Sequence, residues 1–116
     1  MKTKKPSVAR LKKKADIAFS LYIRKRDKNI CFTCGRQGNQ AGHFRSRRYN
    51  STRYDPLNVH CQCMQCNVLE HGNQYIYGIN LDKKYGSGTA EKLYNKSLEH
   101  HKLTIEELTD IMVQYK

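Results

Sequence analysis

Apolar side chains recur at helical spacing near the start of the chain, within residues 7–28. Lysine and arginine occupy the remaining faces, and Ser7 after Pro6 suits the position that caps a helix N-terminus. The pattern therefore predicts an amphipathic helix over 7–28, with one face toward a core and the others toward a partner. Its apolar stripe comprises Val8, Leu11, Ala15, Ala18, Phe19, Tyr22 and Ile23.

Residues 29–67 break this periodicity, because hydrophobic residues are scarce and glycines interrupt short segments. The string AGHFRS at 41–46 is compatible with a strand, and RRYNSTRYDPLN at 47–58 is typical of a loop. So polar a stretch can scarcely be held together by burial alone, and it needs a staple.

Helical spacing returns in the last part of the chain and predicts three helices, over 73–85, 89–100 and 105–116. Gly86 would end the first of them, and a capping box from Thr104 to Glu107 would begin the last. We therefore expect one α+β domain over 1–116. It would consist of a long N-terminal helix, a central core over 29–72 and a helical part over 73–116.

Charge is distributed unevenly along the 116 residues, which carry 22 Lys+Arg against 10 Asp+Glu, a net charge of +12. Residues 1–28 hold +9 of this excess and residues 29–71 hold +3, whereas residues 72–116 are neutral. A positive surface of this kind attracts a polyanion through counterion release. A lone lysine run would more simply be a solubilising tail, but arginines continue the excess into the cysteine-rich region. We therefore expect a nucleic-acid partner.

The basic amino terminus, residues 1–14, has no apolar run behind it and does not resemble a secretory signal. No stretch approaches the roughly eighteen apolar residues that cross a bilayer. These features predict a cytoplasmic protein with no membrane partner, whose residues 1–14 form a basic and partly disordered arm.

Five cysteines, an odd number, argue for a metal site rather than a disulfide framework. Cys31–Cys34 and Cys63–Cys66 form two CxxC knuckles separated by 28 residues, and together they can offer four thiolates to a structural Zn²⁺. Buried or redox thiols are the alternative that a single knuckle would leave open. Cys61 lies in no knuckle and is predicted to be a small core residue.

Three polar residues stand at fixed positions relative to the knuckles. His43 lies between them, Asn58 precedes Cys63 by five residues, and Asn67 directly follows Cys66. This spacing resembles that of the HNH (His-Me finger) nucleases, in which a histidine ends the first strand of a ββα unit. The resemblance implies a small zinc-stapled ββα core, flanked by the N-terminal and C-terminal helices, that cleaves phosphodiester bonds with a divalent ion.

Longer strings narrow the likeness to one family, over nearly the whole chain from about Ala15. AFSLYIRKRD, CFTCGR, AGHFRS, RYDPLNVHCQCMQCN and GNQYIYGINLDKKYG resemble the NinG (Rap) recombination endonuclease family of phage lambda. That family implies a phage-encoded endonuclease, in the host cytoplasm, that selects branched DNA such as Holliday junctions and D-loops. A homodimer would suit a four-way junction, because two strands must be cut, but no dimer interface is legible in the sequence.

One position departs from the HNH pattern. Many HNH enzymes carry an acidic or histidine metal ligand just before the catalytic histidine, and here that position is Gly42. We expect Asn67 and His60 to hold the Mg²⁺ or Mn²⁺ ion instead. His71 is a weaker candidate, because a helix would place it on the same face as Asn67.

The remaining roles follow from side-chain chemistry. An imidazole titrates near neutrality, so His43 would be the general base, and the amide of Asn58 would orient the loop that carries it. The forked guanidinium groups near His43 suit phosphate, as do lysines on the first helix. These expected DNA contacts are Arg45, Arg47, Arg48, Arg53, Lys12, Lys13 and Lys14.

Each residue also has a structural alternative. A lone histidine on a short strand is usually structural, Asn67 could cap a helix, His60 could merely support a ligand, and the arginines could be solvated. At the level of the protein, a zinc-ribbon module that binds nucleic acid without cutting it competes with the nuclease, and a thiol redox protein is a third class. Only the nuclease explains a histidine and two asparagines at this spacing.

Overall fold

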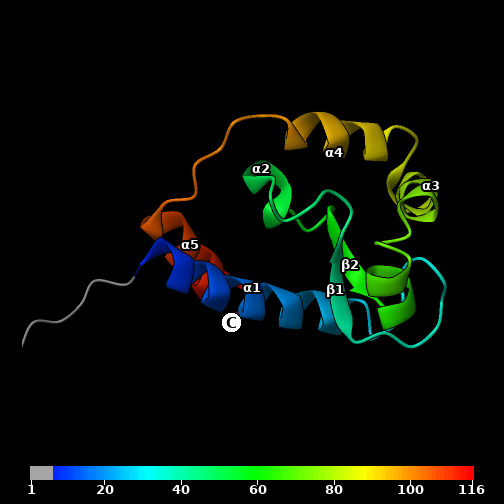
Figure 1. Ribbon diagram of the computed structural model, residues 1–116, viewed down its shortest axis with the longest axis horizontal. Coiled ribbons are helices and arrows are strands. Elements are labelled where there is room, and N and C mark those ends of the chain that lie inside the picture. The colour runs from blue at the N-terminus through cyan, green and yellow to red at the C-terminus, as the bar shows by residue number, and fades with distance from the viewer. Residues whose placement is uncertain (1–6) are drawn as a thin grey trace, which may run out of the picture.

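The computed structural model describes residues 7–116 and shows mixed helices around a small two-stranded sheet (Figure 1). The elements are α1 (Val8–Arg26), β1 (Gln40–His43), α2 (Asn50–Arg53), β2 (Val59–Gln62), the π-helical segment η1 (Gln65–Leu69), α3 (Gln74–Tyr85), α4 (Thr89–Ser97) and α5 (Ile105–Gln114). Within this part of the chain, no helix combines the length and the apolar character that crossing a membrane requires. The expected α+β class is confirmed at the level of helices with a small sheet.

Helix α1 begins where the sequence predicted, because the Ser7 hydroxyl accepts a hydrogen bond of 3.1 Å from the Arg10 backbone N–H. Its buried side chains are Leu11, Ala15, Phe19 and Ile23. Residues 8–14 of the predicted basic arm are helical, in agreement with the helix expected over 7–28. The rest of that arm, residues 1–6, lies outside the described residues.

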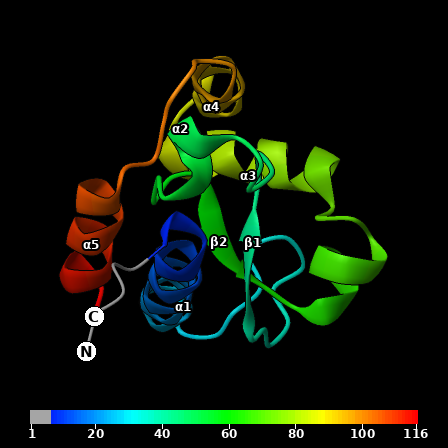
Figure 2. The ribbon, with the colours of Figure 1, turned by 60° about the vertical axis from the view of Figure 1, so that its left-hand side comes forward.

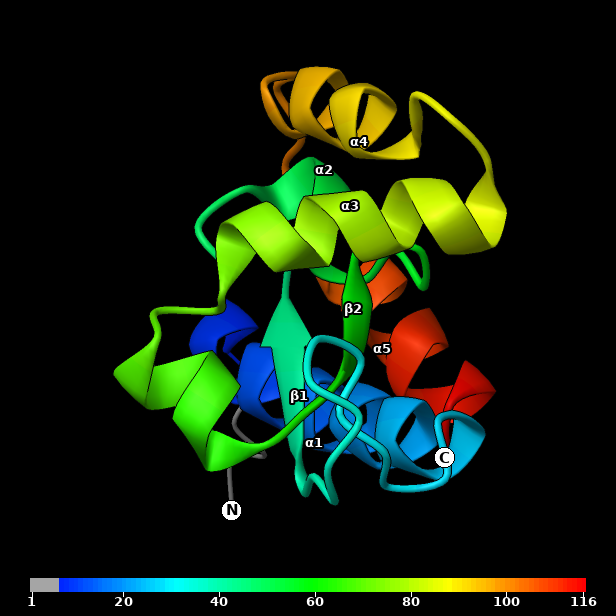
Figure 3. The same ribbon diagram turned by 90° about the vertical axis from the view of Figure 1, so that its right-hand side faces the viewer.

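The hairpin of β1 and β2 is antiparallel, with Gln40 opposite Gln62 and His43 opposite Val59. One face packs on α1, where Val59 joins Phe19 and Ile23. The other face meets α3, whose Tyr77 hydroxyl donates to the Gly42 carbonyl at 2.7 Å. Figure 3 shows the hairpin between these two helices. Both faces of the sheet are thus covered, and its end at His43 is fixed from two sides.

Helix α5 returns to the start of the chain and lies alongside α1 (Figures 1 and 2). Leu11 and Ala15 of α1 form a buried cluster with Leu103 and Leu108. One of the two hydrogen bonds of the predicted capping box is formed, since the Thr104 hydroxyl accepts from the backbone N–H of Glu107 at 3.1 Å. The C-terminal helices therefore close the core instead of extending from it.

Several element boundaries differ from the sequence prediction, and α1 and α5 each end two residues earlier than expected. The loop expected over 47–58 contains the short helix α2, which is tied to α4 by a 2.6 Å hydrogen bond from the Ser51 hydroxyl to the Lys96 carbonyl. The strand expected over 41–46 ends at His43, and the helix expected to reach residue 100 ends at Ser97. A four-residue helix held by tertiary contacts leaves no periodic pattern in the sequence.

Candidate functional site

Four thiols from two distant segments meet at one end of the hairpin. The sulfur atoms of Cys31, Cys34, Cys63 and Cys66 all lie within 4.8 Å of one another, and those of Cys34 and Cys63 are 3.6 Å apart. Tetrahedral zinc with Zn–S bonds of about 2.3 Å would place the sulfurs about 3.8 Å apart. The cluster therefore fits a structural metal such as zinc, as the two knuckles predicted.

The thiols differ in how readily they ionise. Burial opposes ionisation of Cys31, but hydrogen bonds from Thr33 and from backbone N–H groups lower its pKa to about 6. Desolvation and the neighbouring thiols raise the pKa of Cys34 to about 12. Four thiolates at this spacing thus need a cation. Cys61 is fully buried on β2 and stands outside the cluster.

The geometry of His43 fixes which of its ring nitrogens can act as a base. Its Nε2 lies 3.0 Å from the backbone carbonyl oxygen of Arg53. A carbonyl only accepts, so Nε2 carries the proton and Nδ1 keeps the lone pair. Burial, together with the positive charges of Arg47 and Arg53, lowers the pKa of His43 to about 4. The ring is therefore neutral at physiological pH.

Asn58 is fully buried beside the strand end and uses its whole side chain to hold the loop that follows His43. Its Oδ1 accepts from the Arg45 backbone N–H at 2.8 Å. Its Nδ2 donates to the carbonyls of Arg45 and Thr52, both at 3.0 Å. One carboxamide thus fixes the chain on both sides of the segment 46–51.

A cavity of about 640 Å³ opens beside His43 and brings it together with Asn67 and His71. The Asn67 Nδ2 donates a hydrogen bond to the Gln40 Oε1 at 2.9 Å, so the Asn67 Oδ1 takes no part in that bond. His71 is exposed and adopts a left-handed backbone, with φ of 51°. Guanidinium groups complete the lining of this cavity, from Arg45, Arg47 and Arg48. The cavity therefore combines imidazole, amide oxygen and positive charge.

His60 does not join this cavity. It is fully buried, its Nδ1 lies 3.2 Å from the Tyr77 hydroxyl, and its Nε2 lies 2.8 Å from the Tyr85 hydroxyl. Its ring also stacks on Phe32 at 4.0 Å. Both nitrogens are thus already engaged, so the geometry does not support the expected pairing of His60 with Asn67. His71, the weaker candidate in the sequence, lines the cavity beside Asn67 instead.

The arginines divide into two groups. Arg45 lies between the rings of Tyr49 and Tyr94, at 4.6 and 4.5 Å, on the cavity wall. Arg53 instead forms two hydrogen bonds to the Asp16 carboxylate, at 2.6 and 3.2 Å, and lies outside the cavity lining. Its guanidinium is therefore committed within the fold, and what it offers the site is its backbone carbonyl. Of the lysines predicted to contact DNA from α1, Lys12 is half-buried, whereas Lys13 and Lys14 are exposed.

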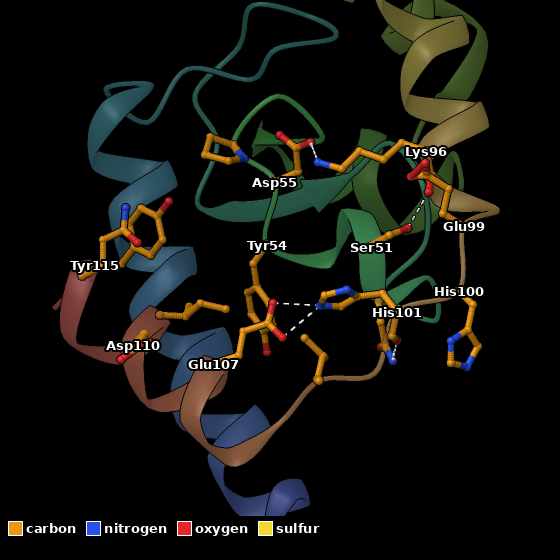
Figure 4. A pocket seen from close by; sticks show the side chains of 15 residues that line it. Ser51, Tyr54, Asp55, Lys96, Glu99, His100, His101, Glu107, Asp110 and Tyr115 are labelled. Atoms are coloured by element: carbon orange, nitrogen blue, oxygen red, sulfur yellow. Dashed lines mark hydrogen bonds and ion pairs between the residues drawn. The ribbon is translucent and has the colours of Figure 1, made fainter.

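A second cavity, of about 580 Å³, lies between α2, the segment after α4, and α5 (Figure 4). Two ion pairs lie on its wall. Lys96 contacts Asp55 at 2.6 Å, and His101 contacts Glu107 at 2.8 Å. Since His43 and Asn67 line the other cavity, this one is separate from the candidate site.

The fold and the cysteine cluster define a small basic α+β protein with a metal-type thiol site. The family model described as Bacteriophage Lambda NinG protein matches residues 1–116, so the chain belongs to the NinG family. The proteins named ninG of Escherichia phage 933W, Escherichia phage lambda and Salmonella phage P22 are each 30% identical to it over 109 residues. These matches cover 90% of this chain and 54%, 53% and 53% of the respective relatives.

The family resemblance drawn from the sequence is thus confirmed. The chain spans about half the length of these relatives. No solved structure matches it significantly.

Proposed function

We propose that the chain is a metal-dependent DNA endonuclease of the HNH type, with His43 as its general base and branched recombination intermediates as its substrates. The observation that carries the proposal is the cavity in which the neutral imidazole of His43 lies with Asn67 among arginines. Phosphodiester hydrolysis needs a base for water, charge relief on the phosphate and stabilisation of the leaving oxygen. The preference for branched DNA rests on the sequence resemblance.

In the proposed reaction, Nδ1 of His43 takes a proton from water while the water oxygen attacks phosphorus. One P–O ester bond breaks, and the leaving oxygen takes a proton from solvent. The Arg53 carbonyl holds the ring in the required tautomer and stabilises the positive charge that develops on it. A bound phosphate would raise the pKa of His43 from its low value, because a nearby negative charge favours the protonated form.

The donors of the cavity suit Mg²⁺ or Mn²⁺, whereas the four thiols suit zinc. Asn67 offers its side-chain oxygen, since its Nδ2 is hydrogen-bonded to Gln40. His71 offers an imidazole in the lining of the same cavity. When bound there, the divalent ion supplies positive charge to the phosphate and to the leaving oxygen. The proposed protein thus uses two metals, one structural and one catalytic.

Positive side chains would hold the DNA backbone around this point. Arg47 and Arg48 are exposed on the cavity wall, and Arg45 presents a guanidinium already positioned between two tyrosine rings. Guanidinium forks match phosphate geometry, so these three are the proposed phosphate contacts. Cutting both strands of a four-way junction would engage two copies of the chain.

Replacement of His43 by alanine tests the proposal directly. Cleavage of branched DNA in Mg²⁺ or Mn²⁺ should fall by roughly 10²- to 10⁴-fold, the usual cost of losing a general base. Zinc content, helical circular dichroism and DNA affinity should stay near those of the parent, because the thiols and arginines are untouched. His100→Ala is the matched control, since His100 is exposed and lines the other cavity.

Two outcomes would contradict the proposal. Parent-like cleavage by the His43→Ala variant would remove the histidine from the mechanism. A parent protein that binds branched DNA but never cuts it, with either ion, would favour the non-catalytic zinc-ribbon module instead. EDTA in parallel reactions separates dependence on the divalent ion from contamination by an unrelated nuclease.

A further inference from the structure

The space beside Gly42 is filled from the neighbouring strand. A Cβ built on Gly42 would collide with Oε1 of Gln62 and would come within 3.0 Å of Oδ1 of Asn67. Two carboxamide oxygens therefore converge where the side chain of residue 42 would lie. This is the position, directly before His43, at which many HNH enzymes carry a metal ligand.

The orientation of Gln62 follows from its hydrogen bonds. Its Nε2 donates to the Gly72 carbonyl at 2.9 Å and to the Thr33 hydroxyl at 3.1 Å. Because a carbonyl cannot donate, the amide nitrogen must face Gly72 and the oxygen must face the other way. That oxygen is fully buried and has no hydrogen-bond partner within residues 7–116. A buried carbonyl without a partner is costly, so its position requires an explanation.

Asn67 presents its carboxamide oxygen to the same space. Its Nδ2 is bound by the Gln40 Oε1 at 2.9 Å, so its Oδ1 faces the Gly42 side. Two acceptor oxygens then meet without a donor between them among the described residues, and their dipoles repel. A positive centre between them would satisfy both, and hard oxygen donors of this kind suit Mg²⁺ or Mn²⁺.

We propose that Gln62 Oε1 is a ligand of the divalent ion, together with Asn67 Oδ1, and replaces the acidic side chain that Gly42 lacks. This inference rests on the proposed function, because the ion is the one that would assist cleavage. The ligand is also tied to the cysteine cluster. Thr33, which accepts from Gln62, lies 3.3 Å from the sulfur of Cys31. The structural metal thus helps to set the position of an oxygen that binds the catalytic one.

Gln62→Met tests the assignment, because methionine keeps the length of the side chain and removes the oxygen. Mn²⁺ affinity of the zinc-loaded protein, measured from the electron paramagnetic resonance signal of free Mn²⁺, should fall roughly 10-fold or more. Gln114→Met, at an exposed position of α5, should bind Mn²⁺ as the parent does. Zinc content and circular dichroism report whether each variant is folded.

A paired substitution separates lost coordination from lost packing. Gly42→Asp alone should lower the melting temperature, since its Cβ collides with Gln62. Gly42→Asp combined with Gln62→Ala should recover or exceed parental Mn²⁺ affinity, because the carboxylate enters the vacated space. A double variant that is folded but binds Mn²⁺ no better than Gln62→Ala would count against the site.

If the variants do not fold, a measurement on the unaltered protein tests whether Gln62 binds the divalent ion. During Mg²⁺ titration, the side-chain amide resonances of Gln62 and Asn67 should shift together with one midpoint. A shift at Asn67 without one at Gln62, or parental Mn²⁺ affinity in Gln62→Met, overturns the assignment. If that happens while His43→Ala still abolishes cleavage, the proposed function stands without this ligand. Parental cleavage by His43→Ala would instead remove the proposed function itself.

Discussion

At His43, a single backbone carbonyl decides the chemistry that the ring can perform. The Arg53 oxygen takes the proton-bearing Nε2, so the lone pair lies on Nδ1 before any substrate arrives. Burial and two nearby guanidinium charges keep the ring neutral far below its ordinary titration range. As the proposed base, the ring has its orientation set in advance, and its basicity rises only when negative charge enters the cavity.

This arrangement gives a pH dependence that can be measured. The Hε1 resonance of His43 in the free protein should titrate with a midpoint near pH 4, below the 6.5 of an ordinary histidine. The ring is neutral above that midpoint and is protonated, and so inactive as a base, below it. Binding of uncleavable DNA in Ca²⁺ should move the midpoint upward, because phosphate charge favours the imidazolium. A midpoint at or above 6.5 in the free protein would contradict this environment.

Single residues also show where sequence reasoning stopped. The positions relative to the knuckles singled out His43 and Asn67, which line one cavity in the structure, but they could not reveal that His60 contacts two tyrosines. Those tyrosines lie 17 and 25 residues further along the chain. The same applies to Arg53, whose partner Asp16 lies 37 residues earlier on α1. Local patterns identify reactive side chains, whereas their long-range partners determine which of them stay free.

At the scale of elements, the cysteine cluster joins the loop after α1 to the turn that follows β2 and to η1, which contains Cys66. This connection fixes η1, and η1 carries Asn67 to the cavity. Metal in the cluster should therefore stabilise both the hairpin and the site. Since a preformed thiol cluster does not exist in the unfolded chain, metal binding and folding are coupled.

Elemental analysis should find close to one zinc per chain. The double variant Cys34→Ser, Cys66→Ser should lose the metal and much of the cooperative unfolding transition, because binding free energy contributes to folding in small zinc sites. Cys61→Ala should keep its zinc, since Cys61 is buried outside the cluster. Full zinc retention in the double variant would refute the assignment of these thiols.

Elements with strong local signals were predicted well. Serine and threonine caps located the starts of α1 and α5, and Gly86, with φ of 116°, closed α3 as expected. Helix α2 was missed, because its four residues are held by hydrogen bonds to α4 and to the Asn58 side chain. The strand was placed correctly but made too long, since the Asn58 side chain takes over its pairing at Arg45. A side chain that replaces the backbone hydrogen-bond partner of a strand leaves no periodic pattern in the sequence.

At the scale of the whole molecule, the proposed function predicts that the uneven charge determines how DNA is bound. The log of the affinity should fall linearly with the log of salt concentration, by about 0.9 for each phosphate neutralised. Replacing Arg47 and Arg48 by alanine should therefore reduce the slope by roughly 2. Lys92→Ala with Lys102→Ala, two exposed residues of the neutral C-terminal part, should leave it nearly unchanged. A slope that does not respond to the arginine pair would place DNA on another surface.

The bonds of Asn58 have a consequence for how this protein can diversify. Because one buried carboxamide closes the chain at Arg45 and at Thr52, the six residues between them form an excursion with both ends fixed. Residues 50 and 51 belong to α2, so a change of length is best tolerated in 46–49, where doubling a flexible loop costs about 0.6 kcal/mol. The excursion carries Arg47 and Arg48, which contact the DNA backbone in the proposed function. In the proposed function, substrate preference could therefore change through this segment while His43 keeps its place.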